Sequence, residues 1–221
     1  LCIPRGGENL IRAVAECSRV PVIKHYKGIC HVYIDGEADQ SMAEEIAFNS
    51  KTHRPGVCNA AETLLIDKLA ANIILPSLCK KFSLAGVELR GDETTNNILS
   101  GSGIETRLAS DSDWDEEYLD MILSIKIVDG IKEAIEHINN HGSGHTETII
   151  TRNHESARRF QTEVDSSTIF WNASTRFTDG GQFGMGAEIG ISTDKIGARG
   201  PMGREELTTY KWLGEANGLI R

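Results

Sequence analysis

Cys58 is the residue whose surroundings best suit a nucleophile. It follows a turn at Pro55 and Gly56, which should hold the thiol on the rim of a loop. A short helix beginning at Asn59 would direct its free amides toward the sulfur and favour the thiolate. The alternative is a buried, unreactive cysteine, which is the usual role of a cysteine taken at random. The flanking turn favours the nucleophile.

A glycine-rich loop over 172–190 is the second stretch suited to chemistry. Its glycines come after a polar run, Asn-Ala-Ser-Thr-Arg-Phe, that begins at Asn172. A long glycine-rich loop in a compact domain is usually functional or disordered. The polar run favours a functional loop. An alternative for Arg176 in this run is a surface ion pair with Asp179, worth about 0–1 kcal/mol.

Composition excludes several classes of protein. The chain has 221 residues and a net charge of −9, which argues against a nucleic-acid surface because phosphate binding needs clustered Lys and Arg. No apolar run approaches the roughly 20 residues that span a bilayer, so we expect no membrane segment. The cysteines are odd in number, widely spaced and without a CxxC pair. This pattern argues against a disulfide framework or a structural zinc site and indicates a reducing, cytosolic setting.

Strands and helices alternate along the chain, which predicts an α/β protein with a mostly parallel sheet. Active sites in such sheets lie beyond the carboxyl ends of strands, so we expect the Cys58 loop and the 172–190 loop there. Residues 91–113 read as a long surface loop with at most one helical turn. The expected strands are 1–3, 20–23, 29–34, 62–67, 87–90, 121–128, 146–151 and 168–171, and the expected helices 8–16, 40–52, 69–82 (kinked or restarted at Pro76), 131–140 and 155–164.

Several runs resemble one known family. They are IPRGG from Ile3, VPVIKHYKGICHVYID from Val20, RPGVCNAAETLL from Arg54, GSGHTETI from Gly142, NASTRFTDGGQFGMGAEIGIST from Asn172, and ARGPMGREELTTYKW from Ala198. Together they resemble the gamma-glutamyl phosphate reductases of the aldehyde dehydrogenase superfamily. The resemblance implies an α/β, aldehyde dehydrogenase-like catalytic domain with the tail end of a Rossmann-like cofactor domain. It also implies that roughly the first half of the family's chain is absent.

The resemblance further implies three segments and an activity. Residues 1–36 would be the remnant of the NADP-binding domain, 37–210 the catalytic domain, and 211–221 a terminal strand that joins a partner subunit. The activity implied is NADPH-dependent reduction of L-glutamyl 5-phosphate to L-glutamate 5-semialdehyde in proline biosynthesis. Cys58 would displace phosphate to form a thioester, which hydride then reduces. The segment 23–28 lacks the base glutamate of oxidative relatives, which fits phosphate as the acyl partner.

Roles carried over from the family extend to further residues, and no metal ligand is among them. The cofactor would contact Arg5, Gly6, Gly7 and Glu117, and the substrate Lys24, His25, Asn172, Ser174, Thr175, Arg176 and Phe183. Among these, Arg176 offers the planar fork that suits a carboxylate. Glu117 has the alternative of being a solvated acid before a strand. We interpret His145 as structural.

The resemblance also implies a setting and partners. It implies a cytoplasmic enzyme that forms a homo-oligomer when full length, with glutamate 5-kinase as a candidate partner. Two alternatives stay open: an inactive fragment that serves as an assembly module, and another acylating aldehyde dehydrogenase. We expect no NADPH-dependent reduction by the 221 residues alone, and we expect Cys58 to be the one fast-alkylating thiol of the five.

Overall fold

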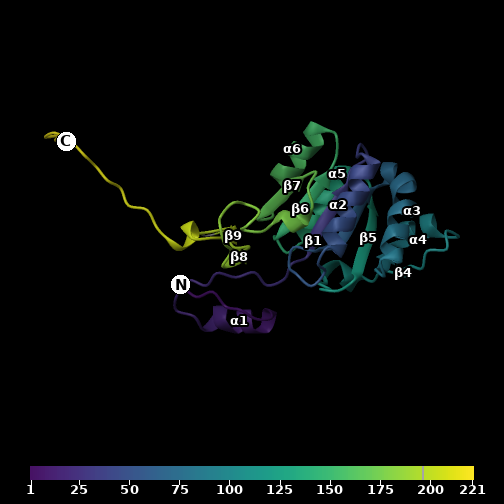
Figure 1. Ribbon diagram of the computed structural model, residues 1–221, viewed down its shortest axis with the longest axis horizontal. Coiled ribbons are helices and arrows are strands. Elements are labelled where there is room, and N and C mark those ends of the chain that lie inside the picture. The colour runs from purple at the N-terminus through teal and green to yellow at the C-terminus, as the bar shows by residue number, and fades with distance from the viewer. Residues whose placement is uncertain (196) are drawn as a thin grey trace.

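A seven-stranded parallel sheet forms the centre of the molecule, with the strand order β4-β3-β5-β2-β1-β6-β7 (Figure 1). The computed structural model describes residues 1–195 and 197–221. The strands are β1 (Cys30–Ile34), β2 (Ala61–Asp67), β3 (Glu88–Gly91), β4 (Arg107–Leu108), β5 (Ile122–Val128), β6 (Thr146–Ile150) and β7 (Thr168–Trp171). The helices are α1 (Glu8–Cys17), α2 (Gln40–Thr52), α3 (Lys68–Leu84), α4 (Glu93–Leu99), α5 (Gly130–His141) and α6 (His154–Glu163).

Successive side chains of each strand point to opposite faces of this sheet and so contribute to two separate hydrophobic cores. Val32 of β1 and Leu64 of β2 pack toward α2 and α3 on one face. Tyr33 and Leu65, the next residue of each strand, pack toward α5 and α6 on the other face. Strands buried on both faces read as continuous apolar runs, which is why the central strands could be predicted from the sequence. The predicted fold class, a parallel-rich α/β sheet flanked by helices, is confirmed.

The stretch 91–113 has more regular structure than the predicted loop with at most one helical turn, because it contains α4, β4 and a 3-10 helix at Asp111–Asp115. Asp92 caps α4 by accepting a hydrogen bond from the amide of Thr95 at 2.8 Å. This cap lets a polar, threonine- and asparagine-rich segment begin a helix in spite of its weak helix propensity. The helix does not restart at Pro76, since α3 runs from Lys68 to Leu84, and the alternative of a kink there stays a prediction.

The N-terminal segment forms much less sheet than the apolar residues suggested. The strands expected at 1–3 and 20–23 reduce to a single parallel bridge between Cys2 and Val22. Pro21 beside this bridge has no amide to donate, so the pairing cannot extend into a regular ladder. Helix α1 lies apart from the seven-stranded sheet, on the same side as the small antiparallel pair β8 (Gly190–Ser192) and β9 (Gly200–Met202) (Figure 1).

The chain ends in an extended tail that leaves the body of the molecule (Figure 1). Its side chains are exposed, and residues 211–221 form no strand within this single chain. Their pairing with a partner subunit stays a prediction, as does the division into domains. The boundary predicted at 36 leaves β1 in the N-terminal segment, although β1 pairs with β2 and β6. None of the helices in the described part of the chain has the length and apolar character needed to cross a bilayer.

Candidate functional site

Cys58 lies in the turn that joins α2 to β2. No helix follows it, because β2 begins at Ala61, so the predicted helix at Asn59 is wrong. The turn leads into the amino end of β2, and the parallel register places it beside the amino end of β1 at Cys30. The site therefore lies at the amino edge of the sheet and not at the predicted carboxyl edge. The apolar residues after Asn59 pair as a strand, which leaves the thiol without free helix amides.

Gly28 packs directly on the backbone of Cys58. A Cβ at position 28 would lie 2.1 Å from the carbonyl oxygen of Cys58 and 2.6 Å from its Cα, so only glycine fits there. The amide of Gly28 donates to Oε1 of Glu117 at 2.8 Å. On the side of the sheet, the thiol of Cys30 donates a hydrogen bond to the Cys58 carbonyl oxygen at 3.2 Å. These contacts fix the backbone of the turn between a loop and the first residue of β1.

The electrostatic surroundings of Cys58 oppose the predicted thiolate. Burial raises the pKa of the Cys58 thiol to about 11, and the carboxylates of Glu117 and Glu188 add to the shift. The guanidinium of Arg176 acts in the opposite direction with a smaller effect. We therefore correct the expected order of alkylation: exposed Cys17 should react before Cys58 in this chain.

Two histidines lie beside the thiol. The candidate ligand atoms of His25, Cys58 and His145 all lie within 4.8 Å of one another. His145 is fully buried, and this burial lowers the pKa of its imidazole to about 3, which makes it neutral at ordinary pH. The sequence analysis assigned His145 a structural role. It missed the proximity because β6, which starts after His145, pairs with β1 only in the folded sheet.

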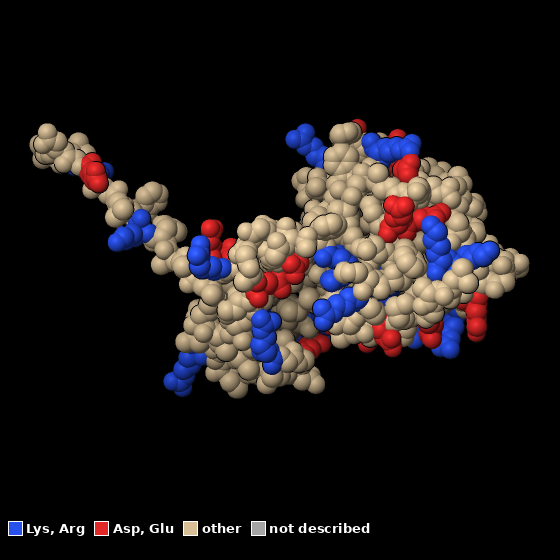
Figure 2. Space-filling view, viewed as in Figure 1, with Lys and Arg blue, Asp and Glu red and all other residues tan. Residues whose placement is uncertain are grey.

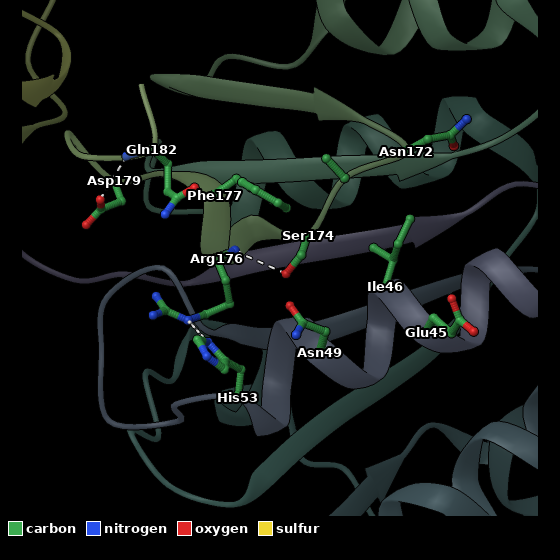
Figure 3. Close-up of a pocket in the computed structure, with 11 residues that line it drawn as sticks. Glu45, Ile46, Asn49, His53, Asn172, Ser174, Arg176, Phe177, Asp179 and Gln182 are labelled. Atoms are coloured by element: carbon green, nitrogen blue, oxygen red, sulfur yellow. Dashed lines mark hydrogen bonds between the residues drawn. The ribbon is translucent and has the colours of Figure 1, made fainter. Parts of the chain in front are cut away.

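A cleft of about 810 Å³ opens between α2 and the segment that follows β7 (Figure 3). Three predicted substrate residues, Asn172, Ser174 and Arg176, line it. The other lining residues are Glu45, Ile46, Asn49, His53, Ala173, Phe177, Asp179 and Gln182. Beyond the cleft, Thr178 bonds to both Asn59 and Thr146, so the segment crosses from the carboxyl to the amino edge of the sheet. The segment that lines the cleft therefore also contacts Asn59, the residue that follows Cys58.

The polar residues on this segment differ in what they are free to bind. Asn172 has a φ of +57° and bonds both the amide and the carbonyl of Thr151. Ser174 bonds to the hydroxyl of Ser50 at 3.0 Å, and Thr175 is buried with no hydrogen-bond partner for its hydroxyl among the described residues. Arg176 instead extends beside the cleft, where its Nε donates to Nδ1 of His53 at 3.3 Å (Figure 3).

The alternative role of Arg176, an ion pair with Asp179, is not among the ion pairs of the described residues. Burial lowers the pKa of the Arg176 guanidinium, and the nearby charge of Arg54 adds to this effect. A bound anion would relieve both effects. Acidic and basic side chains are otherwise interspersed over the face shown in Figure 2.

Three further predicted residues, Arg5, Lys24 and His25, gather around a cavity of about 110 Å³ beside β8. Lys24 pairs with Asp194 at 2.8 Å, and Arg5 donates to the carbonyl of Ile189. Gly6 also lines this cavity, whereas Gly7 is the N-cap of α1. Phe183 lies elsewhere, edge-on to Phe170 with 6.2 Å between ring centroids.

Comparison with known proteins shows what this chain is similar to. The aldehyde dehydrogenase family model matches residues 104–212. The whole chain is 55% identical to 52% of a gamma-glutamyl phosphate reductase of Thermodesulfovibrio yellowstonii, and 52% identical to 52% of that of Geobacter metallireducens. The chain thus spans about half the length of the curated relatives it matches.

Solved structures agree with this assignment. The crystal structure of the gamma-glutamyl phosphate reductase of Thermotoga maritima has a TM-score of 0.93 and 46% identity, over 99% of this chain and 52% of that one. An acetylating aldehyde dehydrogenase of Geobacillus thermoglucosidasius, at 21% identity and a TM-score of 0.63, shares the fold. The chain is therefore similar over its whole length to about half of a gamma-glutamyl phosphate reductase, and over residues 104–212 to the aldehyde dehydrogenase family.

Proposed function

We propose that this chain carries the catalytic cysteine of a reductase that converts L-glutamyl 5-phosphate to L-glutamate 5-semialdehyde and phosphate, with NADPH as the hydride donor. One observation carries the proposal: Cys58 and Arg176, on separate loops, lie close enough for the charge of each to shift the pKa of the other. A thiol thus lies near a guanidinium that itself lines the cleft. The relatives named gamma-glutamyl phosphate reductase support the choice of substrate.

The reaction begins when the Cys58 sulfur attacks the acyl carbon and the C–O bond to phosphate breaks, which leaves a thioester and inorganic phosphate. The imidazoles of His25 and His145 lie beside the thiol and can accept its proton. The backbone amide of Cys58 can donate to the developing oxyanion. Arg176 binds the α-carboxylate of the substrate through its planar fork.

The nicotinamide cofactor supplies the hydride that reduces the thioester to the aldehyde, and the residues near Cys58 fit such a group. Glu117 uses only Oε1 in a hydrogen bond with the described residues, which leaves Oε2 for ribose hydroxyls. Arg5, Gly6 and Gly7 lead into α1, whose N-terminal amides suit a phosphate. Lys24, His25 and Phe183 stay predicted substrate contacts. NADPH as the specific cofactor, a homo-oligomer, a cytoplasmic setting and contact with glutamate 5-kinase also stay predictions.

The first half-reaction tests this proposal without the cofactor. The chain is mixed with L-glutamyl 5-phosphate, generated in place by glutamate 5-kinase and ATP, quenched in acid and analysed by mass spectrometry. We expect a glutamyl thioester on Cys58 that Cys58→Ser loses and the control Cys17→Ser keeps. Labelling by acyl-coenzyme A but not by the acyl phosphate would favour another acylating dehydrogenase. Labelling by neither would favour the assembly module.

The second half-reaction needs the rest of the cofactor domain. We would join this chain to the part of the Thermotoga maritima reductase that it does not match, and measure NADPH oxidation with the same substrate. We expect activity that depends on Cys58, and none from the 221 residues alone. Phosphate-independent turnover of the chimera would contradict the proposed reaction.

A further inference from the structure

The cluster of His25, Cys58 and His145 has a property that the proposed reaction does not require. One ligand atom from each residue lies within 4.8 Å of the other two. The three residues come from distant parts of the chain: the loop before β1, the turn before β2, and the segment before β6. Because no short spacing joins them, the sequence predicted no metal site. The parallel register of β1, β2 and β6 brings them to one edge of the sheet.

The hydrogen bonds of His145 leave one nitrogen free to bind a ligand. Its Nδ1 lies 2.8 Å from the hydroxyl of Thr146, and that hydroxyl gives its own hydrogen to Thr178. Nδ1 must therefore be the protonated nitrogen, which leaves the lone pair on Nε2. Nε2 is buried and has no hydrogen-bond partner among the described residues. A buried acceptor without a partner is costly, so this atom calls for a ligand.

His25 has the same tautomer for a different reason. Its Nδ1 lies 3.2 Å from the carbonyl oxygen of Ile191, which can only accept, so Nδ1 carries the hydrogen. The lone pair is again on Nε2. Metal-binding histidines commonly have this arrangement, in which a second-shell oxygen orients the ring and fixes the tautomer.

We propose that His25, Cys58 and His145 form a binding site for a thiophilic divalent cation such as Zn²⁺, with a fourth position open to water. One thiolate and two imidazoles are ligands that zinc prefers. On binding, the Cys58 S–H bond breaks, the metal–sulfur bond forms, and the proton leaves to solvent. The nearby carboxylates of Glu117 and Glu188, which disfavour a free thiolate, favour a cation at this point.

The geometry needs only small movements to close around the ion. Zinc–sulfur and zinc–nitrogen distances of about 2.3 and 2.0 Å bring ligand atoms in a tetrahedral site to roughly 3.3–3.7 Å from one another. His145 is fixed in the core, whereas His25 lies on a loop that can move toward it. Bound metal would hold the sulfur that the proposed reaction uses, and so inhibit that reaction reversibly. Only this consequence depends on the proposed function, because metal binding itself is independent of it.

Cobalt titration of the 221-residue chain tests the site, since Co²⁺ reports its own ligands in the absorption spectrum. We expect one equivalent to produce a thiolate-to-cobalt band in the near ultraviolet and the visible bands of a tetrahedral site, both displaced by Zn²⁺. Cys58→Ser should remove the near-ultraviolet band. His25→Gln, on a loop, should weaken binding about ten-fold or more. Cys17→Ser and His154→Gln, at exposed positions, are the matched controls.

Three outcomes would overturn the proposal: no band at equimolar cobalt, a thiolate band that persists in Cys58→Ser, or unchanged affinity in His25→Gln. His145→Asn is a second check, with circular dichroism to show that the core stays folded. Zn²⁺ should also protect Cys58 from iodoacetamide while Cys17 stays reactive. The thioester assay tests the proposed function and the cobalt titration tests the metal site. Either can fail while the other succeeds, so the two failures are distinguishable.

Discussion

The residues around Cys58 form two different groups, one on the side of the sheet and one on the side of the loops. The sheet side consists of Cys30, Glu62 and His145, which are fully buried at the starts of β1, β2 and β6. The loop side consists of His25, Glu117, Arg176 and Glu188, which are partly or fully exposed and lie outside the α-helices and strands. The sheet side is held by strand register and by buried hydrogen bonds. The loop side is held by single contacts such as that of Gly28 with Glu117.

The difference indicates how the work of the site is divided. Buried groups in fixed positions set the tautomer of His145 and hold the Cys58 carbonyl, and they tolerate little movement. Charged groups on loops can adjust to a substrate and dominate the charge around the thiol. Changes on the sheet side should therefore alter stability, and changes on the loop side should alter reactivity. The following variants test that division.

Lys51→Ala should have the largest effect, because it leaves Glu62 on the sheet side without its buried partner at 2.5 Å. We expect a loss of about 3–5 kcal/mol in the free energy of unfolding, measured by urea denaturation. The control is Lys81→Ala, whose partner Glu44 pairs with a half-exposed ammonium, and which should cost about 0–1 kcal/mol. A loss below 1 kcal/mol for Lys51→Ala would contradict the comparison.

The loss of stability in Lys51→Ala should depend on pH. Burial raises the pKa of Glu62 to about 7, although Lys51 opposes the shift. A carboxyl group whose pKa is raised in the folded state costs stability as pH rises from its unfolded pKa through its folded pKa. Removing Lys51 raises the folded pKa of Glu62 further. The loss should therefore be larger at pH 8 than at pH 5, and an equal loss at both would show that Glu62 stays neutral.

Gly28→Ala tests the junction between the two sides. The added Cβ would meet the Cys58 carbonyl at 2.1 Å, so the loop must move away from the turn. We expect a loss of about 1–3 kcal/mol and faster iodoacetamide labelling of Cys58. Gly214→Ala, where an added Cβ would meet nothing within 4 Å, is the matched control. Unchanged labelling would show that the loop does not cover the thiol.

Arg176→Lys should alter reactivity rather than stability. In the chimeric reductase we expect kcat/KM for the acyl phosphate to fall on the order of ten-fold, about 1.4 kcal/mol of transition-state binding, because Lys lacks the planar fork. The melting temperature should hardly change. Arg54→Lys, a neighbouring exposed arginine, is the control. Normal kinetics with a lowered melting temperature would assign Arg176 to the structure of the loop, through His53.

Glu117→Gln should have the smallest effect. Its carboxylate helps to raise the pKa of the Cys58 thiol, so the neutral amide should lower that pKa and speed alkylation at pH 8 a few-fold, which corresponds to less than about 1.4 kcal/mol. In the unmodified chain the rate should rise with pH up to about 11, as the thiol ionises. Glu116→Gln, the adjacent exposed acid, is the control. Equal rates in both variants would exclude the charge of Glu117 as a cause.

The sheet was more predictable from the sequence than the site was. Apolar runs such as 29–34 identify central strands, because a strand buried on both faces leaves no polar alternation. Local patterns could not show that His145 lies beside Cys58, because strand pairing across the sheet creates that proximity. The turn at Pro55 located the thiol, but no helix begins at Asn59, because the turn leads directly into β2. Of the predicted substrate residues, Asn172 bonds to the backbone of Thr151 and Thr175 is buried, which their residue types could not reveal, and their substrate roles stay predictions.

The strand order also sets a sequence of events during folding. Strands β3 and β4 precede β5 in the sequence, yet β3 is connected to the rest of the sheet only through its pairing with β5. The segment from Glu88 to Leu108 therefore has no edge to join until Ile122–Val128 has paired with β2. By contrast, β1 and β2 can pair at once. Pulsed hydrogen exchange should therefore find the amides of β3 and β5 protected together, later than those of β1, because non-local pairing is slow.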